Sequence, residues 1–235
     1  MTIGAFLVQL IGDTFLGTHL LETLSLTPYL IFEKHYFWQF VTYMFMHADL
    51  FHILFNMLIL WMIGSELEGQ WGTKFFLKYY FVCGLSAGVF YLAVQSFLHG
   101  SANMVPMLGS SGAVYGLLVA YGIIYSERMM LFMMVFPMKA KHFVMILAAI
   151  EFISTVFYSR AGVANAAHLG GMVVGFAYLF LNAWLRIRAK RKKTGKKQRM
   201  RRSHLRLVVN NEVLKEFDDD DDEDEDSDPG RPTFH

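Results

Sequence analysis

The sequence predicts an all-α, polytopic membrane protein with six transmembrane helices. Of its 235 residues, 54% are hydrophobic and only 17% are charged, and the mean hydropathy is +0.36. These values argue against a soluble globular domain. The apolar residues also gather in long stretches with few charges, as helices that face lipid or another helix require.

Six apolar segments can be distinguished along the chain. They cover residues 3–16, 50–64, 75–98, 111–125, 141–158 and 164–184. The first is the weakest, because it is short and Asp13 interrupts it. Several are shorter than the roughly 20 residues that a full span prefers, so tilt or thinner lipid would have to accommodate them.

The net charge of +1 hides two opposite blocks near the C-terminus. Twelve of the 21 Lys and Arg residues lie between Arg186 and Arg206, and ten of the 20 acidic residues lie between Asp218 and Asp228. A basic block directly after the last apolar segment indicates a cytoplasmic C-terminus. We expect residues 188–235 to be a disordered cytoplasmic tail whose basic part touches lipid headgroups rather than nucleic acid.

The loops predict the orientation of the bundle. With six spans, the N-terminus is also cytoplasmic, and the loops after the second and fourth helices lie inside, where most basic loop residues fall. The inner residues are Lys74, Lys78, Arg128, Lys139 and Lys141, and the outer loops hold Lys34 and Arg160. The start of the fourth helix therefore lies toward the outer side.

The remaining segments carry weaker signals. Residues 1–37 are expected to hold the first helix and the start of a long aromatic loop that lies in the membrane interface, and residues 38–187 the core. Residues 129–136 are too short to span. Cys83 is the sole cysteine, so an intrachain disulfide is excluded. The first basic residue is Lys34, which argues against a secretory signal peptide.

Ser111, between glycines in the run 109–112, opens the fourth apolar segment, and His168 lies within the sixth. Polar residues in membrane segments are costly, so this pair suggests a nucleophile and its base. His52 and Asn56 are four apart and share one helix face. Both can donate hydrogen bonds, and with the Ser111 amide at a helix start they would form an oxyanion hole.

Small residues predict that the fourth and sixth helices approach closely. Gly112 and Gly116 are four apart in one segment, and Gly171 and Gly175 are four apart in the other. Tyr115, one turn after the serine, would stack on the His168 imidazole. No Asp or Glu is expected to complete a triad. Glu151, an acid within the fifth segment, is assigned no catalytic role, since it could equally pair with a polar neighbour.

Each feature taken alone has a simpler explanation. A lone histidine or asparagine in a membrane helix is most often interhelical glue, and paired glycines usually mean packing. His47 and His99 are interpreted as interfacial or structural, and Asn165 as a helix start or a border of the site. The combination is what favours catalysis.

Three motifs in this order resemble the rhomboid family of intramembrane serine proteases. They are His52-Ile53-Leu54-Phe55-Asn56, then Gly109-Ser110-Ser111-Gly112 with Tyr115, then Ala167-His168-Leu169-Gly170-Gly171 with Gly175. The spacing of Gly64 and Glu68 also matches, and the resemblance covers about residues 38–184. One departure is Trp38-Gln39, where many members have Trp-Arg.

The resemblance implies a six-helix rhomboid-like bundle and a Ser111–His168 dyad without metal or cofactor. His52, Asn56 and the Ser111 amide would hold the oxyanion, while Tyr115, Gly109, Gly112 and Gly171 would support the site. Substrates would be transmembrane proteins cut in or near their membrane segments. The implied location is the cell membrane of a bacterium, in contact with its lipids and not with nucleic acid.

Two alternatives remain at this point. The first is an inactive rhomboid-like protein that binds membrane clients, although inactive relatives typically lack the serine or histidine. The second is a metalloprotease that uses His47, His52 and His168. The sequence lacks a His-Glu-x-x-His helix and a carboxylate beside these histidines. The metalloprotease therefore ranks well below both the serine protease and the inactive protein.

Overall fold

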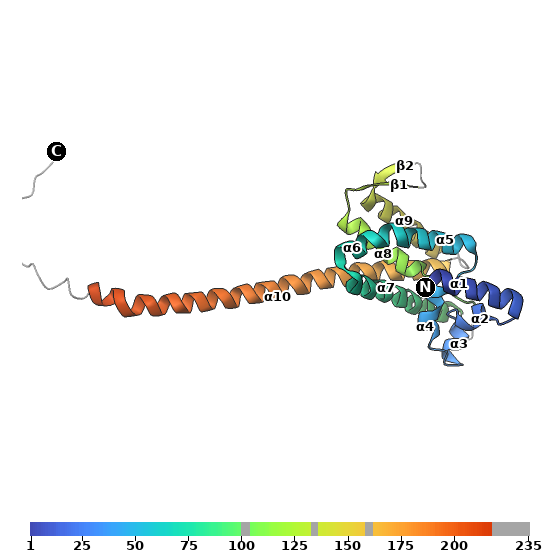
Figure 1. Ribbon diagram of the computed structural model, residues 1–235, viewed down its shortest axis with the longest axis horizontal. Coiled ribbons are helices and arrows are strands. Elements are labelled where there is room, and N and C mark those ends of the chain that lie inside the picture. Colours follow the sequence, from blue (N-terminus) through green and yellow to red (C-terminus); the bar gives the residue numbers. More distant parts are fainter. Residues whose placement is uncertain (100–103, 133–135, 158–161, 218–235) are drawn as a thin grey trace, which may run out of the picture. The chain divides into compact units, whose positions relative to one another are not determined.

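The computed structural model describes residues 1–99, 104–132, 136–157 and 162–217, and it is mostly helical (Figure 1). The chain forms two units, Met1–Leu181 and Asn182–His235. The helical elements are α1 (Thr2–Ile11), η1 (Gly12–Leu16), α2 (Leu20–Leu24), α3 (Pro28–Phe32), α4 (Gln39–Thr42), η2 (Tyr43–Phe45), α5 (Leu50–Ile59), η3 (Leu60–Gly64), α6 (Ser65–Trp71), α7 (Thr73–His99), α8 (Ser111–Ile124), α9 (Ala140–Phe157) and α10 (Gly162–Phe217).

Within the described residues, four helical stretches are long and apolar enough to cross a membrane. They are Leu50–Trp71, Thr73–Leu98, Ala140–Phe157 and Asn165–Thr194. Only 11% to 39% of each apolar window is buried inside the protein, so most of these surfaces need an apolar surrounding. Thr2–Leu16 and Ser111–Ile124 are apolar but shorter. Four spans are therefore supported by length, and the predicted six are not.

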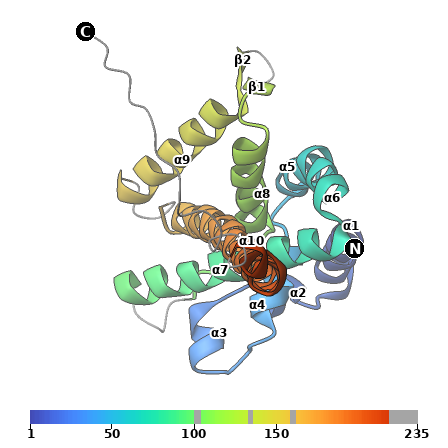
Figure 2. The same ribbon diagram turned by 90° about the vertical axis from the view of Figure 1, so that its left-hand side faces the viewer.

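Helix α8 is the centre of the first unit. Ten of its 14 residues are buried, and it packs against α5, α7 and α9 (Figure 2). A short helix that longer helices enclose need not reach both membrane surfaces itself, because its neighbours separate its ends from lipid. This position places the polar start of α8 inside the bundle.

The long loop after α1 folds into short helices that are fastened by backbone pairing. Leu26 and Met107 exchange both backbone hydrogen bonds at 2.8 Å, which joins this loop to the segment before α8. Gln39 is fully buried, accepts from the Thr27 amide at 3.1 Å and donates to the Thr23 carbonyl at 2.9 Å. A glutamine thus anchors the loop where many members of the family have Trp-Arg.

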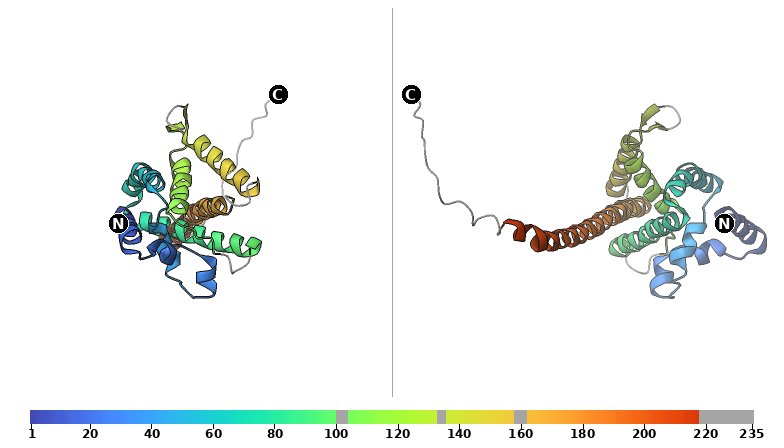
Figure 3. Two further views of the ribbon diagram at one scale, coloured as in Figure 1. Left: turned by 90° about the vertical axis from the view of Figure 1, so that its right-hand side faces the viewer. Right: turned by 60° about the vertical axis from the view of Figure 1, so that its left-hand side comes forward.

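The fold is mostly helical, as the all-α prediction requires, and one short hairpin interrupts it. Strands β1 (Met129–Phe132) and β2 (Phe136–Lys139) form an antiparallel hairpin between α8 and α9 (Figure 3). Pro137 disfavours a helix here, and strand pairing satisfies the backbone instead. Glu127 pairs with Lys139 at 2.6 Å and with Lys141, and the pKa of Glu127 falls to about 2 through these two ammonium groups.

The sequence predicts a disordered tail over residues 188–235, but part of this tail is helical in the structure. Helix α10 runs to Phe217, so residues 188–217 are helical. Lys, Arg and Gln are good helix formers, and no proline interrupts the basic block. The acidic block at 218–228, together with Arg160, lies outside the described residues, and so does the side chain of His99.

Candidate active site

The site is built around the turn that precedes α8. Gly109 has a φ of +101°, a conformation that side chains rarely adopt. A Cβ atom there would also lie 2.7 Å from His52 Nε2. The turn is held by the Gly109 amide, which donates to the Tyr43 carbonyl at 2.9 Å. It delivers Ser111 as the first residue of α8, at the positive end of the helix dipole.

Ser111 and His168 are in direct contact. The Ser111 Oγ atom lies 2.7 Å from His168 Nε2, although the two residues are 57 positions apart in the sequence. A hydroxyl that donates to a neutral imidazole at this distance is the arrangement in which histidine can act as general base. The predicted pairing of the two residues is therefore present in the structure.

The glycines make this contact possible. A Cβ atom on Gly171 would overlap the carbonyl of Gly112, so the backbones of α8 and α10 touch. The predicted stacking is also present, since the Tyr115 and His168 rings lie 4.4 Å apart at 13°. Sequence reasoning missed the third partner, α7, where a Cβ atom on Gly112 would collide with Ala87.

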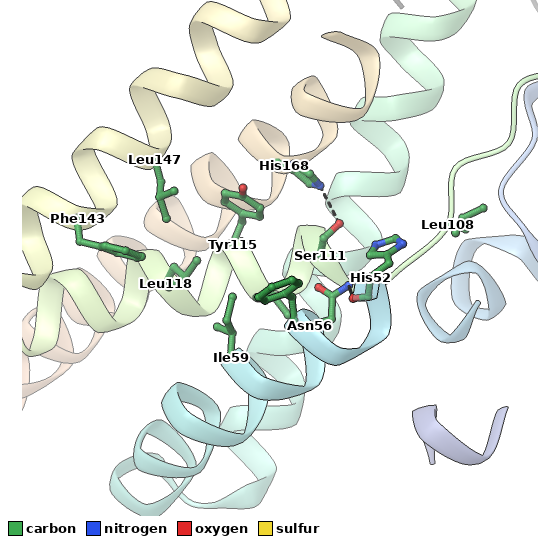
Figure 4. Close-up of a pocket in the computed structure, with 12 residues that line it drawn as sticks. His52, Asn56, Ile59, Leu108, Ser111, Tyr115, Leu118, Phe143, Leu147 and His168 are labelled. Carbon is green, nitrogen blue, oxygen red and sulfur yellow. Dashed lines mark hydrogen bonds between the residues drawn. The ribbon is translucent and has the colours of Figure 1, made fainter. Parts of the chain in front are cut away.

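His52 and Asn56 reach the site from α5. The carboxylate of Asp49 caps this helix and accepts from the His52 amide at 2.8 Å. The Asn56 Nδ2 atom donates to the His52 carbonyl at 3.1 Å. Figure 4 shows both side chains beside Ser111, on the side of the serine away from Tyr115. The two side chains and Ser111 thus lie at the same part of the site.

These polar groups open into one cavity of about 450 Å³. The cavity is lined by His52, Phe55, Asn56, Ile59, Leu108, Ser111, Val114, Tyr115, Leu118, Phe143, Leu147 and His168 (Figure 4). Most of the lining is apolar, and the polar groups converge at one end. An apolar peptide segment could bind here with one carbonyl at the serine.

One expectation about this site is wrong. No acid was expected near the histidine, yet Glu151 Oε1 of α9 lies 3.2 Å from His168 Nδ1. The carboxylate is buried, with the residue only 7% exposed. Glu151 is 17 positions before His168 on another helix, and α9 is apolar around its circumference. The intramembrane acid itself was the available signal, but nothing local in the sequence tells which way it points.

The other singled-out residues lie at the border of the site. His47 is fully buried, and burial lowers its pKa to about 4, so it is neutral at physiological pH. Gln9 of α1 bonds both the His47 amide and its carbonyl, which gives this residue a structural position. Asn165 is half-buried in the first turn of α10. Within the described ranges, no three His, Cys, Asp or Glu side chains gather as metal ligands would.

Comparison with known proteins agrees with this geometry. The model of the Rhomboid domain matches residues 34–184, which is well over half of the chain. The chain is a member of the rhomboid family. Its motifs at Ser111, His168 and His52 all fall within the matched range.

Several named relatives share this rhomboid region. Rhomboid protease GlpG of Haemophilus influenzae is 31% identical over 151 residues, which are 63% of this chain and 71% of that protein. Rhomboid protein 1, mitochondrial, of Saccharomyces cerevisiae is 29% identical over 163 residues, 65% of this chain and 45% of the relative. Rhomboid protease GluP of Bacillus subtilis is 26% identical over 139 residues, 59% and 25% of the two chains. The match thus spans less than half of the yeast and Bacillus proteins.

Proposed function

We propose that this rhomboid is an intramembrane serine endopeptidase with Ser111 as nucleophile and His168 as general base. The observation that carries the proposal is the 2.7 Å contact between Ser111 Oγ and His168 Nε2 at the polar end of an apolar cavity. The names of the relatives, which include rhomboid proteases, support the same reading. An inactive protein that only binds membrane clients would not need this contact.

The proposed reaction is acyl transfer in two stages. His168 Nε2 takes the hydroxyl proton of Ser111 while Oγ attacks the carbonyl carbon of the scissile peptide bond. The negative oxygen of the intermediate is held by His52, Asn56 and the Ser111 amide. The C–N bond then breaks, and the proton of His168 goes to the leaving amine. Water from the cavity, deprotonated by His168, hydrolyses the remaining ester and frees Ser111.

The proposed substrates are transmembrane proteins cut in or near their membrane segments. An apolar cavity with its polar groups at one end suits an apolar chain that has unwound enough to present a carbonyl. No cofactor or metal is part of this mechanism.

We further propose six membrane crossings, in which the short helices Thr2–Leu16 and Ser111–Ile124 join the four long ones. Both termini would be cytoplasmic, which the basic residues after Trp184 and at the β1–β2 hairpin support. We propose a bacterial cell membrane, although relatives include a mitochondrial protein. Family membership alone therefore does not choose between these membranes.

Covalent labelling tests the nucleophile directly. The detergent-solubilised protein should react with a fluorophosphonate or an isocoumarin probe, and Ser111→Ala should abolish labelling. His168→Ala should reduce it severely, because an unactivated hydroxyl is a poor nucleophile at neutral pH. Ser65→Ala is the matched control, since that hydroxyl bonds only carbonyls of its own helical stretch, and labelling should persist.

The alternatives predict other outcomes. A folded native protein that neither labels nor cleaves a transmembrane substrate would favour the client-binding protein. Cleavage that a chelator blocks and that survives Ser111→Ala would favour the metalloprotease.

A further inference from the structure

Glu151 is an unusual residue for its helix. After the first turn of α9, it is the only charged residue, and α9 otherwise presents mostly exposed or half-buried apolar side chains. The two buried residues of α9 are Ala140 and Glu151. Burying a carboxylate among membrane helices costs free energy unless a polar partner compensates for the lost water. The reason for its position must therefore lie in what it contacts.

Glu151 contacts the ring nitrogen of His168 that does not contact Ser111. Glu151 Oε1 lies 3.2 Å from Nδ1, while Ser111 Oγ lies 2.7 Å from Nε2 of the same ring. Among the described residues, neither Nδ1 nor Glu151 Oε2 has a hydrogen-bond partner of good geometry, and both atoms are buried. The 3.2 Å approach of Glu151 Oε1 to Nδ1 is the contact through which the two buried groups can compensate each other.

The surroundings of the pair come from two further helices. Tyr115 of α8 stacks on the imidazole, and its hydroxyl interacts with the Glu151 carboxylate. His52 of α5 also lies within electrostatic range of His168. Glu151 does not belong to the residues that line the cavity. Its contact with the reacting pair is the one to His168 Nδ1.

We propose that Glu151 is a positioning residue that turns the Ser111–His168 pair into a Ser-His-Glu triad. Its carboxylate accepts a hydrogen bond from Nδ1–H, which fixes the tautomer whose Nε2 lone pair faces Ser111. When Nε2 takes the serine proton, the carboxylate remains ionised and stabilises the imidazolium. This inference rests on the proposed protease function. It adds a third helix, α9, to the elements that build the site.

The test compares Glu151→Gln with the native protein in cleavage of a transmembrane substrate. We expect kcat to fall by up to about 10⁴-fold, the loss that follows Asp→Asn in a Ser-His-Asp triad. KM should change little, because Glu151 does not line the cavity. The acidic limb of the pH profile of kcat/KM should also move to lower pH, because the protonated imidazole loses its counter-charge.

Two further variants separate positioning from helix packing. Glu151→Leu keeps a similar side-chain volume and removes the carboxylate. Loss of one ion-pair partner is destabilising where it leaves a buried charge unpaired, and a neutral imidazole leaves no such charge. We expect Glu151→Leu to unfold at a similar temperature and yet to lose kcat as Glu151→Gln does. Glu127→Gln is the matched control, since it removes a carboxylate at the β1–β2 hairpin, and its kcat should equal that of the native protein.

The outcomes distinguish this inference from the function on which it rests. If the native protein reacts with the fluorophosphonate probe and cleaves, but Glu151→Gln keeps its kcat and its pH profile, the triad is wrong and the dyad stands. If the native protein neither labels nor cleaves, the protease proposal itself fails. Loss of kcat only in proportion to loss of folded protein would make Glu151 a packing residue and would overturn the inference.

Discussion

Each polar side chain at the site has a specific local reason for its position. Gly109 adopts a positive φ and leaves room for His52, so the turn before α8 can lie against α5. Asp49 caps α5 and thereby fixes where its first turn begins. The serine that follows the turn is presented at a helix start. A few short-range rules thus orient the groups that would touch a substrate carbonyl.

At this scale, we predict that His52→Ala and Asn56→Ala each slow cleavage. Removal of one oxyanion donor typically costs about 10²- to 10³-fold in rate, so residual turnover should remain while the other donors hold. The measurement is kcat for a transmembrane substrate in detergent or liposomes. His142→Ala, on the first turn of α9, serves as a histidine control and should cleave normally.

Both donors can be tested together. The double variant should be slower than either single variant if the two side chains share the oxyanion. Near-native rates in the two single variants and in the double variant would refute the assignment of this hole.

The elements of the bundle meet where side chains are smallest. Gly171 of α10 lies against the Gly112 backbone of α8, and Gly112 in turn lies against Ala87 of α7. Close backbone contact brings α8 and α10 together without side chains between them. Ser111 lies on α8 and His168 on α10, so the distance between them depends directly on this contact. Helix spacing is therefore part of the geometry that the proposed reaction requires.

We predict that Gly171→Ala separates α8 from α10 and lowers both stability and activity. The new methyl group would meet a carbonyl of the backbone, which cannot turn away as a side chain can. Overpacking of this kind typically costs about 1–3 kcal/mol. Thermal unfolding and cleavage would be measured on the same preparations.

Gly69→Ala is the matched control for this substitution. Gly69 lies in α6, and a Cβ atom there meets nothing within 4 Å. Alanine at such a helical position should stabilise by about 0.5–1 kcal/mol and leave cleavage unchanged. An unaltered melting temperature and rate in Gly171→Ala would show that the close contact of α8 and α10 does not depend on this glycine.

Several charged side chains gather at one end of α8 and at the β1–β2 hairpin. Arg128 of the segment after α8 pairs with Glu66 of α6 at 2.6 Å, and Glu127 pairs with two lysines at the hairpin. Basic groups thus gather at the end of α8 opposite Ser111. From the positive-inside bias, we propose that this end faces the cytoplasm and that the Ser111 site lies toward the outer side.

Reporter fusions test this orientation. A reporter after Arg206 should be active in the cytoplasm, and one between α7 and α8 should be active on the outer side. Alkaline phosphatase and a fluorescent protein report the two sides independently. Reversed signals would overturn both the topology and the outward-facing site.

The sequence by itself determined the features that depend on local order. Apolar length predicted the long helices, because lipid imposes a minimum length on a span. The spacing of His52 and Asn56 predicted a shared face, since both lie on one helix. The motifs around Ser111 and His168 predicted a family and a pair of reactive residues, and the comparisons confirmed the family.

Only the tertiary structure decided which residue the buried acid contacts. Glu151 is visible in the sequence as a charge in an apolar segment, but the direction in which it points is not. In a soluble helix, alternation of polar and apolar faces reveals the inner side. In a membrane helix such as α9, lipid and protein interior are equally apolar, so the sequence contains no such contrast. The packing of α9 against α8 brought Glu151 to His168, and that packing is a property of the assembled bundle.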